Sequence, residues 1–478
     1  MLEKALKKYF HYDTFRPGQR EVIEAVLQEK DVIALLPTGS GKSLCYQLSG
    51  YLLNGAVVIV SPLLSLMQDQ VEQMKRFGEK RVVAINSFLQ GEQRERVLAN
   101  LQAYRYIFVS PEMLGQKSFK RALSRVHIAL IAVDEAHCIS QWGFDFRPEY
   151  LNIGDTIRTF SRVPVLALTA TATNRVKEDI RKYLHMENPY EWISAVDRPN
   201  ICYQVVPIQK HYEKIGWLVA HVQHTTSPGI IYTQSRKKTE EYAEALRESG
   251  VRVAAYHAGI QQDERQLIQH QFIAGELDWI VATNAFGMGV HKENIRQIIH
   301  DHLPSSMGNY LQEVGRAGRD GEQSFATLLF TEEDDRITKS VSVMDYPQEF
   351  HIDEYERLAN QGVNPFIMVE ESRITETSYR ILHYWMHKLP KIEVIEQINQ
   401  MKFEKVKEVD QLQQILTGKD CIREEISRYF EQELLTKPVL CCSVCGLPED
   451  VIPKKRLIKE ASAQLFSWQE RFKQIFPN

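Results

Sequence analysis

Residues 31–43 read DVIALLPTGSGKS, an apolar β-branched run followed by a glycine-rich turn that ends in Lys42 and Ser43. A strand that leads through such a turn into a helix lets backbone N–H groups surround phosphate oxygens. Gly39 and Gly41 permit the close backbone approach that this requires. The stretch therefore predicts a strand, a phosphate-binding loop and a helix, in that order.

The side chains of this loop predict a nucleotide and Mg²⁺. Lys42 is expected to contact β- and γ-phosphate oxygens, and the Ser43 hydroxyl to bind Mg²⁺, with Thr38 and Ser40 completing the loop. The general pattern asks for glycine where Leu36 stands, so a chance GSGKS in a surface turn is the alternative. The preceding strand and a second motif favour the phosphate site.

That second motif is LIAVDEAH, residues 130–137, an apolar strand that ends in two carboxylates. Asp134 is expected to hold Mg²⁺ through its water shell, and Glu135 to polarise the water that attacks the γ-phosphate. An acidic pair at a strand end is otherwise often a solvated turn. Because a phosphate loop precedes it in the same chain, the catalytic interpretation is favoured.

A third segment lies upstream of the loop. Gln19 has the amide groups to bind an adenine edge, and Tyr12 and Arg16 could sandwich the base by stacking and cation–π contact. The alternative is a helix start with Phe15 in the core.

The fold class follows from the alternation of β-branched runs and amphipathic stretches over residues 30–330. Such alternation predicts parallel sheets flanked by helices, and eleven candidate strands exceed one sheet of usual size. We expect lobes over residues 1–205 and 206–335, a helical and zinc-binding region over 336–455, and an amphipathic helix over 456–478. The boundary is placed near residue 205 because Asp197–Asn200 and Pro207 interrupt the pattern.

Composition narrows the class of protein only a little. The 478 residues carry a net charge of −4, with 44% hydrophobic and 25% charged residues. A polyanion site must then be a local basic groove. No apolar run of membrane-spanning length occurs and the N-terminus resembles no secretory signal, so a cytoplasmic protein without a membrane partner is expected.

Nine motifs occur in an order and spacing that resemble one family. They are FRPGQ, PTGSGKS, SPLLSLMQDQV, VDEAHCISQWGFDFRPEY, LTATAT, IYTQSR, YHAG, VATNAFGMGV and QEVGRAGRDG, within residues 15–321. The sequence resembles the RecQ-type DNA helicases of superfamily two, in a short, RecS-like bacterial form without winged-helix and HRDC domains. The resemblance implies two RecA-like lobes and ATP-driven translocation on DNA in the 3′-to-5′ direction.

Residues 138–150, CISQWGFDFRPEY, resemble the family's aromatic-rich loop. Trp142, Phe144, Phe146 and Arg147 offer faces on which bases stack beside the acidic pair. DNA contact there would be communicated through His137 and Gln141. The alternative is that the aromatic residues fill the core, but the Gly, Asp, Arg and Pro between them favour a loop.

In QEVGRAGRDG, residues 312–321, Arg316 and Arg319 are spaced to share one side of a helical turn. The resemblance makes them arginine fingers, with Gln312 beside them, that stabilise phosphoryl charge when the lobes close. A surface charge pair is the alternative. By resemblance alone, Thr169-Ala170-Thr171 links the nucleotide and DNA sites. Thr283, with Gly287 and Gly289, is expected to approach nucleotide and DNA phosphates.

Turns that follow strands supply the remaining candidate DNA contacts, because parallel sheets bind ligands at the carboxyl ends of their strands. We expect these residues to hold DNA phosphates and not bases, as suits a motor that grips every sequence equally. They are Ser61, Ser110, Tyr232, Ser235, Arg236 and His257.

The late cysteines predict structural zinc. Cys421, Cys441, Cys442 and Cys445 are four thiols in a compartment expected to be reducing. In the family the site ends in a Cys-x-x-Cys-x-x-Cys knuckle, whereas here Pro448 stands at the third position and Cys441 is the substitute. A degenerate site, or one completed by another group, is the alternative.

Three functions remain open from sequence. The first is a DNA helicase that unwinds forked or tailed DNA in recombination, replication and repair, as a monomer at the bacterial nucleoid with single-stranded-DNA-binding protein and recombination factors. The second is a DNA-stimulated ATPase that remodels or anneals DNA, favoured because the strand-separating hairpin of longer relatives is normally carried in the domains that this form lacks. The third, an RNA helicase, has the DEAH sequence in its favour and the aromatic loop against it.

Overall fold

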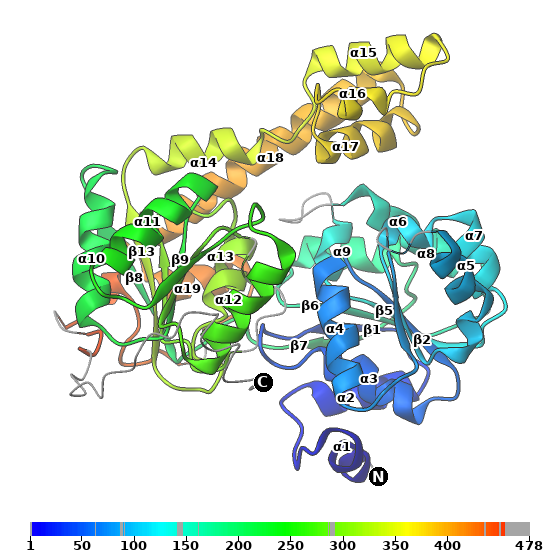
Figure 1. Ribbon diagram of the computed structural model, residues 1–478, viewed down its shortest axis with the longest axis horizontal. Helices are drawn as coiled ribbons and strands as arrows, with labels where there is room; N and C mark the ends of the chain where they lie inside the picture. Colours follow the sequence, from blue (N-terminus) through cyan, green and yellow to red (C-terminus); the bar gives the residue numbers. More distant parts are fainter. Residues whose placement is uncertain are drawn as a thin grey trace, which may run out of the picture.

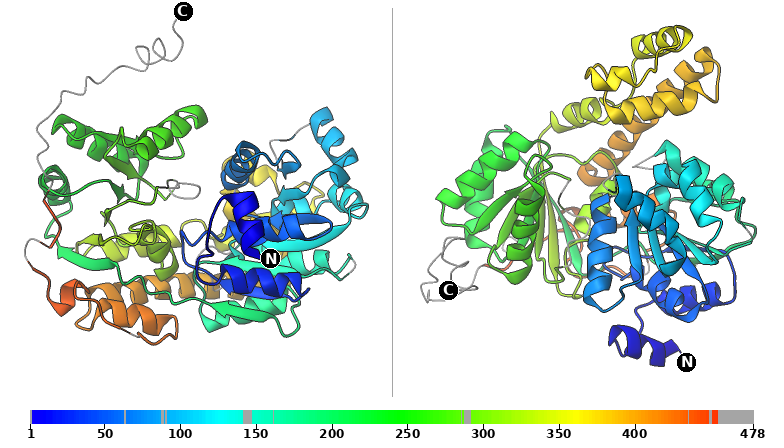
Figure 2. Two further views of the ribbon diagram at one scale, coloured as in Figure 1. Left: turned by 90° about the horizontal axis from the view of Figure 1, so that it is seen from below. Right: turned by 45° about the vertical axis from the view of Figure 1, so that its right-hand side comes forward.

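The computed structural model describes residues 2–454 except 63, 87, 88, 90, 141–146, 161, 285, 287–291, 435, 449 and 450. Two parallel β-sheets lie side by side, each with helices on both faces (Figure 1). A helical arm leads from the second sheet to a position over the first (Figures 1 and 2). The predicted α/β architecture of two lobes with a helical C-terminal region is confirmed.

Lobe one is built on a seven-stranded sheet in the order β3-β4-β2-β5-β6-β1-β7. Its strands are β1 (Val32–Leu35), β2 (Ala56–Val60), β3 (Val82–Ile85), β4 (Tyr106–Val109), β5 (Ile128–Val133), β6 (Val165–Thr169) and β7 (Tyr190–Ile193). Its helices are α1 (Leu2–Phe10), α2 (Gln19–Leu27), α3 (Ser43–Leu52), α4 (Leu64–Arg76), α5 (Gly91–Ala99), α6 (Pro111–Leu114), α7 (Lys117–Leu123), α8 (Ile153–Ile157) and α9 (Asn174–Tyr183). Short 3₁₀ turns cover Leu101–Ala103, Ala136–Ile139 and Pro148–Asn152.

The strand order positions the site in lobe one. Strand β6 pairs in parallel with β1 on one side and β5 on the other. The carboxyl ends of these three strands therefore meet at one edge of the sheet. That edge brings together the phosphate loop after Leu35, the acidic pair after Val133 and Thr169 at the end of β6.

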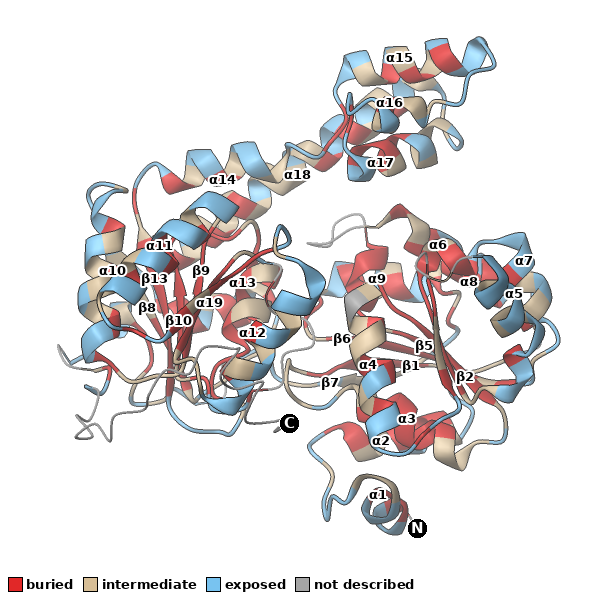
Figure 3. Ribbon diagram, viewed as in Figure 1, coloured by how far each residue is buried: buried red, intermediate tan, exposed pale blue. Residues whose placement is uncertain are grey.

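Buried strands explain the continuous apolar runs in the sequence. Ile33 and Leu35 pack into one core cluster while Val32 and Ala34 pack into another, on opposite faces of the sheet. All four are at most 2% exposed. Helices cover both faces, so inner strands such as β1, β2 and β6 are buried along their whole length, whereas the edge strand β7 is not (Figure 3).

Lobe two has a six-stranded parallel sheet in the order β10-β11-β9-β12-β13-β8. Its strands are β8 (Ile201–Pro207), β9 (Gly229–Tyr232), β10 (Val253–Tyr256), β11 (Trp279–Ala282), β12 (Gln297–His300) and β13 (Ser324–Phe330). Its helices are α10 (Glu213–His224), α11 (Arg236–Glu248), α12 (Gln262–Ala274) and α13 (Met307–Val314).

The connection between the lobes falls slightly before the position expected from sequence. Strand β8 spans residue 205 and pairs with β13 of the second sheet along its whole length. The link is therefore residues 194–200, between β7 and β8. All eleven predicted strands form, and β7 and β8 are additional strands that the sequence pattern did not indicate.

The arm consists of α14 (Asp334–Ser342), α15 (Glu349–Asn360), α16 (Ile367–Glu370), α17 (Glu376–Met386) and the N-terminal part of α18 (Lys391–Thr417). At roughly 1.5 Å per residue, α18 is about 40 Å long. Val409, Leu412 and Leu416, near its C-terminus, are buried in the core of lobe two. Helix α19 (Ile422–Tyr429) and a 3₁₀ turn, Ser443–Cys445, complete the described part of this region.

The far end of the arm touches lobe one. Arg380 of α17 lies 2.5 Å from Glu112 of α6 and 3.6 Å from Glu149, measured from Nη1 to a carboxylate oxygen. Tyr384 of the same helix packs against the core of lobe one. The arm thus connects the two lobes on one side of the molecule.

None of the described helices combines the length and apolar character needed to span a bilayer. The predicted helix over 456–478 lies outside the described residues.

Candidate nucleotide and DNA sites

The phosphate loop adopts the conformation expected from its sequence. Strand β1 ends at Leu35 and α3 begins at Ser43, so the loop precedes a helix N-terminus. Gly39 has φ 84° and Gly41 has φ 77°, in the left-handed region where a side chain is strained. The loop therefore presents N–H groups and the positive end of α3 to an anion.

The acidic pair sits directly opposite the loop. Lys42 Nζ lies 3.5 Å from Glu135 Oε1, and both side chains are largely buried. Glu135 has φ 47°, which is strained for a residue with a side chain and is typical of active sites. Its N–H donates to Asp134 Oδ1 at 3.0 Å, so the two carboxylates are held in fixed relative positions.

Burial separates the acidities of the two carboxyls. Burial and the charge of Glu135 raise the pKa of Asp134 to about 6, although Lys42 opposes the shift. Burial alone would raise the pKa of Glu135 too, but Lys42 and His137 outweigh it and lower that pKa. Glu135 is thus ionised at neutral pH, as a group that orients and deprotonates water must be.

A chain of polar contacts leads from Glu135 to the end of β6. His137 Nδ1 lies 3.4 Å from Glu135 Oε2 and 2.9 Å from Thr169 Oγ1. The Thr169 hydroxyl donates to the Thr171 carbonyl at 3.1 Å. The structure therefore brings the DEAH and TAT segments into direct contact.

The segment expected to bind adenine makes contacts within the protein. Gln19 is 3% exposed, accepts from the Arg16 N–H at 2.9 Å, and donates to the Ser40 carbonyl at 2.7 Å. The nitrogen end of this amide therefore holds the phosphate loop and the oxygen end holds the Arg16 backbone, so an adenine edge would have to replace those partners. Arg16 donates to the Gly39 carbonyl and pairs with Glu293 of lobe two at 3.2 Å, while Tyr12 is 59% exposed.

Lobe two reaches the same loop from across the cleft. A Cβ placed on Gly39 would lie 2.8 Å from Cδ of Arg319, so that side chain lies against the phosphate loop. A Cβ on Gly315 would lie 2.0 Å from Thr38 Oγ1, which leaves room only for glycine there. Arg316 is 6% exposed, and its charge helps to lower the pKa of Glu135. Gln312 lies one turn earlier, on α13.

The expected DNA contacts differ in accessibility. Ser235 and Arg236, at the start of α11, are exposed. Ser61, Ser110 and His257 are at most 8% exposed, and the Ser110 hydroxyl caps α6. These residues and Thr283 follow strands at the carboxyl edges of the two sheets.

The aromatic-rich loop is described only at its end. Gln141, Trp142, Phe144 and Phe146, as well as Gly287 and Gly289, lie outside the described residues. Arg147 is described, and its Nη1 donates to the Pro62 carbonyl at 2.8 Å. This contact joins the end of the loop to the turn after Ser61.

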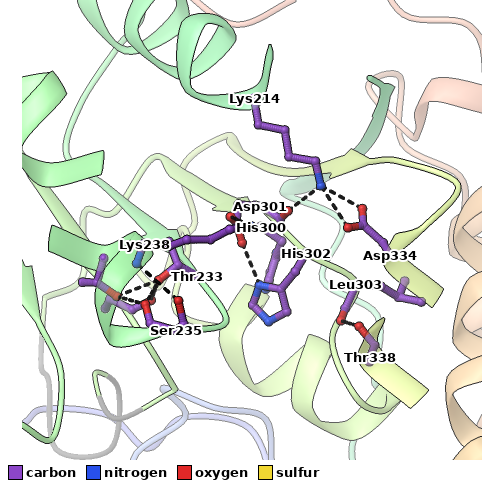
Figure 4. A network of polar contacts seen from close by, with 12 residues as sticks. Lys214, Thr233, Ser235, Lys238, His300, Asp301, His302, Leu303, Asp334 and Thr338 are labelled. Atoms are coloured by element: carbon purple, nitrogen blue, oxygen red, sulfur yellow. Dashed lines mark hydrogen bonds and ion pairs between the residues drawn. The ribbon is translucent and has the colours of Figure 1, made fainter. Parts of the chain in front are cut away.

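A buried polar network that sequence reasoning missed lies behind the Ser235 turn (Figure 4). Asp301 is fully buried, 3.0 Å from His302 and 3.3 Å from Lys238. Burial alone would raise the pKa of Asp301, but His302 and the nearby lysines outweigh it and lower the pKa to about 2. Lys214 joins the Asp301 carbonyl to Asp334 of the arm. The signal was present in the sequence, as charged residues directly after a strand in IIHDH.

The four late cysteines form one cluster. All four Sγ atoms lie within 4.8 Å of one another, with Cys421 to Cys441 at 3.5 Å and Cys442 to Cys445 at 3.4 Å. Thiolates about 2.3 Å from a tetrahedral Zn²⁺ would be separated by similar distances, so the residues fit this ion. Cys421 is the N-cap residue that precedes α19, and its pKa is lowered to about 7 because hydrogen bonds to the sulfur outweigh its burial. The adjacent pair Cys441 and Cys442 both turn inward, despite the awkward spacing.

Comparison with known proteins agrees with this geometry. Residues 16–180 match the DEAD/DEAH box helicase family, and residues 212–321 match the helicase conserved C-terminal domain. The fold resembles Mycobacterium smegmatis helicase Lhr (TM-score 0.54, 20% identity, 71% of this chain and 49% of that one). It also resembles DEAD-box helicase Mss116 (TM-score 0.57, 16% identity, 86% of this chain and 90% of that one). The family matches assign helicase domains to the two lobes, and the fold matches agree with two α/β lobes of this kind.

The curated relatives narrow this class further. The chain is 37% identical to the probable ATP-dependent DNA helicase RecS of Bacillus subtilis, over 99% of this chain and 98% of the relative. It is 41% identical to the ATP-dependent DNA helicase RecQ of Pasteurella multocida, over 68% of this chain and 51% of that protein. The chain belongs to the RecQ family of ATP-dependent DNA helicases, which confirms the expected family.

Proposed function

We propose that this helicase moves 3′-to-5′ on single-stranded DNA and unwinds forked or tailed duplexes in recombination, replication and repair. The observation that carries the proposal is the contact of Arg319, from lobe two, with Gly39 of the phosphate loop in lobe one. Hydrolysis at this site depends on both lobes, so each turnover is linked to their relative movement.

The residues at the cleft have complementary roles in hydrolysis. Lys42 contacts the β- and γ-phosphates, and Glu135 takes the proton of the attacking water. Arg316 and Arg319, with Gln312 near them, stabilise charge on the transferring phosphoryl group. Ser43 and Asp134 hold Mg²⁺, which supplies positive charge to the phosphate oxygens when bound. The buried carboxyl of Asp134 fits such a cation, because its ionised form lacks solvation.

DNA controls this chemistry through the contacts of Glu135. Bases stack on Trp142, Phe144 and Phe146 beside Arg147, and Gln141 and His137 pass the change to the acidic pair. The contacts of His137 with Glu135 and Thr169 support this route. A shift of the loop that moves His137 then changes the position of the catalytic carboxylate.

The remaining contacts grip the DNA backbone without reading sequence. Exposed Ser235 and Arg236, and the turns of Ser61, Ser110, His257 and Thr283, hold phosphates at the carboxyl edges of the sheets. The cysteine cluster binds one structural Zn²⁺. We further propose that the protein acts as a monomer in the bacterial cytoplasm, at the nucleoid, with single-stranded-DNA-binding protein and recombination factors as partners.

One experiment tests the central proposal. ATP hydrolysis is measured with and without single-stranded DNA, and strand displacement on 3′-tailed and 5′-tailed duplexes, for wild type and Glu135→Gln. DNA-stimulated hydrolysis with displacement of the 3′-tailed duplex alone, both lost in Glu135→Gln, is the expected result. Stimulation without displacement would instead indicate a DNA remodeller or annealing factor, and preference for the 5′ tail would contradict the direction. RNA as an equal activator would contradict the choice of DNA.

A further inference from the structure

The segment that links the lobes lies against the turn that carries the two arginines. Arg198 Nη2 donates to the carbonyls of Ala317 at 3.2 Å and Gly318 at 2.7 Å. Asn200 Nδ2 donates to the carbonyls of Gly318 at 2.8 Å and Glu322 at 3.0 Å. Two side chains from outside lobe two's helices thus hold the backbone between Arg316 and Arg319.

The turn is shaped for this contact. Gly318 has φ 55°, and a Cβ placed on it would lie 2.4 Å from Asn200 Nδ2. Only glycine both adopts this conformation without strain and leaves space for the Asn200 amide. The N–H of Ser324 also donates to the Asn200 carbonyl at 2.9 Å, so the linking segment is joined to the start of β13 as well.

The like charges of the two arginines on this turn oppose their close approach. Arg316 is buried and Arg319 is half-buried, and burial together with the like charge of Arg316 lowers the pKa of Arg319 to about 10. Two guanidinium groups with restricted access to solvent repel each other, so their own interaction does not favour the arrangement. Hydrogen bonds to the carbonyls between them oppose that repulsion by fixing the backbone.

The linking segment is itself anchored. Arg423 of α19 is 1% exposed, forms an ion pair with Asp197 and donates to the Arg198 carbonyl at 3.0 Å. Its guanidinium lies 5.0 Å from the centre of the Tyr203 ring. Residues 197–200 are therefore fixed to the cysteine-bearing region on one side and to the arginine turn on the other.

We propose that Arg198 and Asn200 are positioning residues for ATP hydrolysis: they hold the carbonyls of Ala317 and Gly318 and so set where Arg316 and Arg319 meet the phosphate loop. The proposal rests on the role in hydrolysis given above to those two arginines. In this proposal Arg198 and Asn200 act on hydrolysis through the two arginines. Their loss alters the transition state through the arginines and leaves the phosphate loop unchanged.

The test is a double-mutant cycle on DNA-saturated ATP turnover. Arg198→Ala is expected to lower kcat about 10- to 100-fold and Asn200→Ala about 3- to 10-fold, with KM for ATP within about 3-fold of wild type. In an Arg319→Ala background, Arg198→Ala should lower kcat by clearly less than it does in the wild-type background, because one of the two arginines it positions is already absent. Arg198→Lys, which keeps one donor, should fall between wild type and Arg198→Ala.

Arg252→Ala is the matched control, since Arg252 is a lobe-two arginine paired with an aspartate, Asp278, away from the cleft. Its kcat should equal that of wild type. The positioning role would be overturned if the double variant lost kcat by the full product of the separate Arg198→Ala and Arg319→Ala losses. A kcat for Arg198→Ala within about 3-fold of wild type would also overturn it.

Failure of the arginine assignment, and failure of a variant to fold, can be distinguished from failure of the positioning role. Unchanged turnover in Arg319→Ala alone would refute the arginine assignment, and not only the positioning role. If Arg198→Ala does not fold, the same cycle with Asn200→Ala and Arg319→Ala decides the question, since Asn200 supplies the second donor to Gly318.

Discussion

The two halves of the nucleotide site are built differently. In lobe one, Lys42 ends the loop that joins β1 to α3, and Glu135 lies just after β5, so the sheet and the start of α3 set their positions. In lobe two, the arginines sit on a turn after α13 that is held by Arg198 and Asn200 from the linking segment. The first half is fixed by local chain geometry, and the second depends on segments distant in the sequence. Substitutions in the two halves should therefore differ in their effects.

Lys42→Ala tests the first half and should have the largest effect. The substitution removes the cation that meets the β- and γ-phosphates, so ATP turnover should be abolished, by about 10³-fold or more. DNA binding without nucleotide should persist, because the sheet edges remain intact. Turnover and DNA binding by fluorescence anisotropy are the measurements, with the exposed Lys30→Ala as control. Retained turnover would contradict the assignment of the loop.

Arg319→Ala tests the second half directly. Loss of an arginine finger should lower kcat by about 10²- to 10³-fold, with ATP binding retained through lobe one. Rapid-quench measurement of the hydrolysis step, compared with the affinity for a fluorescent ATP analogue, separates the two effects. Equal losses of binding and of hydrolysis would mean that the two halves do not differ as described.

Zinc removal should also act mainly on the second half. A chelator is expected to release one Zn²⁺ per chain and loosen α19, which carries Arg423 and so anchors residues 197–200. DNA-stimulated turnover should fall about 10-fold, while nucleotide binding by lobe one persists. Metal content by atomic emission accompanies the assay, and readdition of Zn²⁺ is the control. Absence of zinc from the purified protein would contradict the metal assignment.

Arg380→Ala should have the smallest effect. Arg380 is partly exposed, and pairs of this kind contribute roughly 0–1 kcal/mol. The Tm should change by no more than about 2 °C, and turnover by less than about 3-fold. Arg357→Ala, in the same arm but away from lobe one, is the control. A large loss of turnover would show that the contact of the arm with lobe one is as important as the cleft.

Sequence predicted lobe one's half of the site better than lobe two's. A strand followed by GSGKS or by DEAH carries its own geometry, because the chain direction and the sheet edge determine where Lys42 and Glu135 lie. Arg198 and Asn200 gave no such signal, since their role depends on contact with Gly318, far along the chain. Gln19 was assigned to adenine because an amide suits that edge, but its contacts with the Ser40 backbone depend on how α2 meets the loop.

In the fold, as in the site, the sequence indicated the elements that have a local pattern and did not indicate those that depend on contacts distant in the chain. Apolar β-branched runs marked eleven strands, whereas β7 has only the short sequence YEWI, and β8 follows the Pro199-Asn200 break that suggested a boundary. Both strands are stabilised by pairing with β1 and β13, which sequence periodicity does not record. Likewise, the adjacent cysteines share a site because Cys442 lies beside Tyr203 of β8.

The length of α18 amplifies any rotation between the two lobes. One end is buried in lobe two, and the other carries the bundle that touches Glu112 and Glu149 of lobe one. Over its length of about 40 Å, a rotation of about 10° at lobe two displaces the far end by about 7 Å. A rotation that moves the residues at the nucleotide only slightly therefore moves Arg380 far enough to break its contact with lobe one. The contact between the tip of the arm and lobe one thus depends on the angle between the lobes.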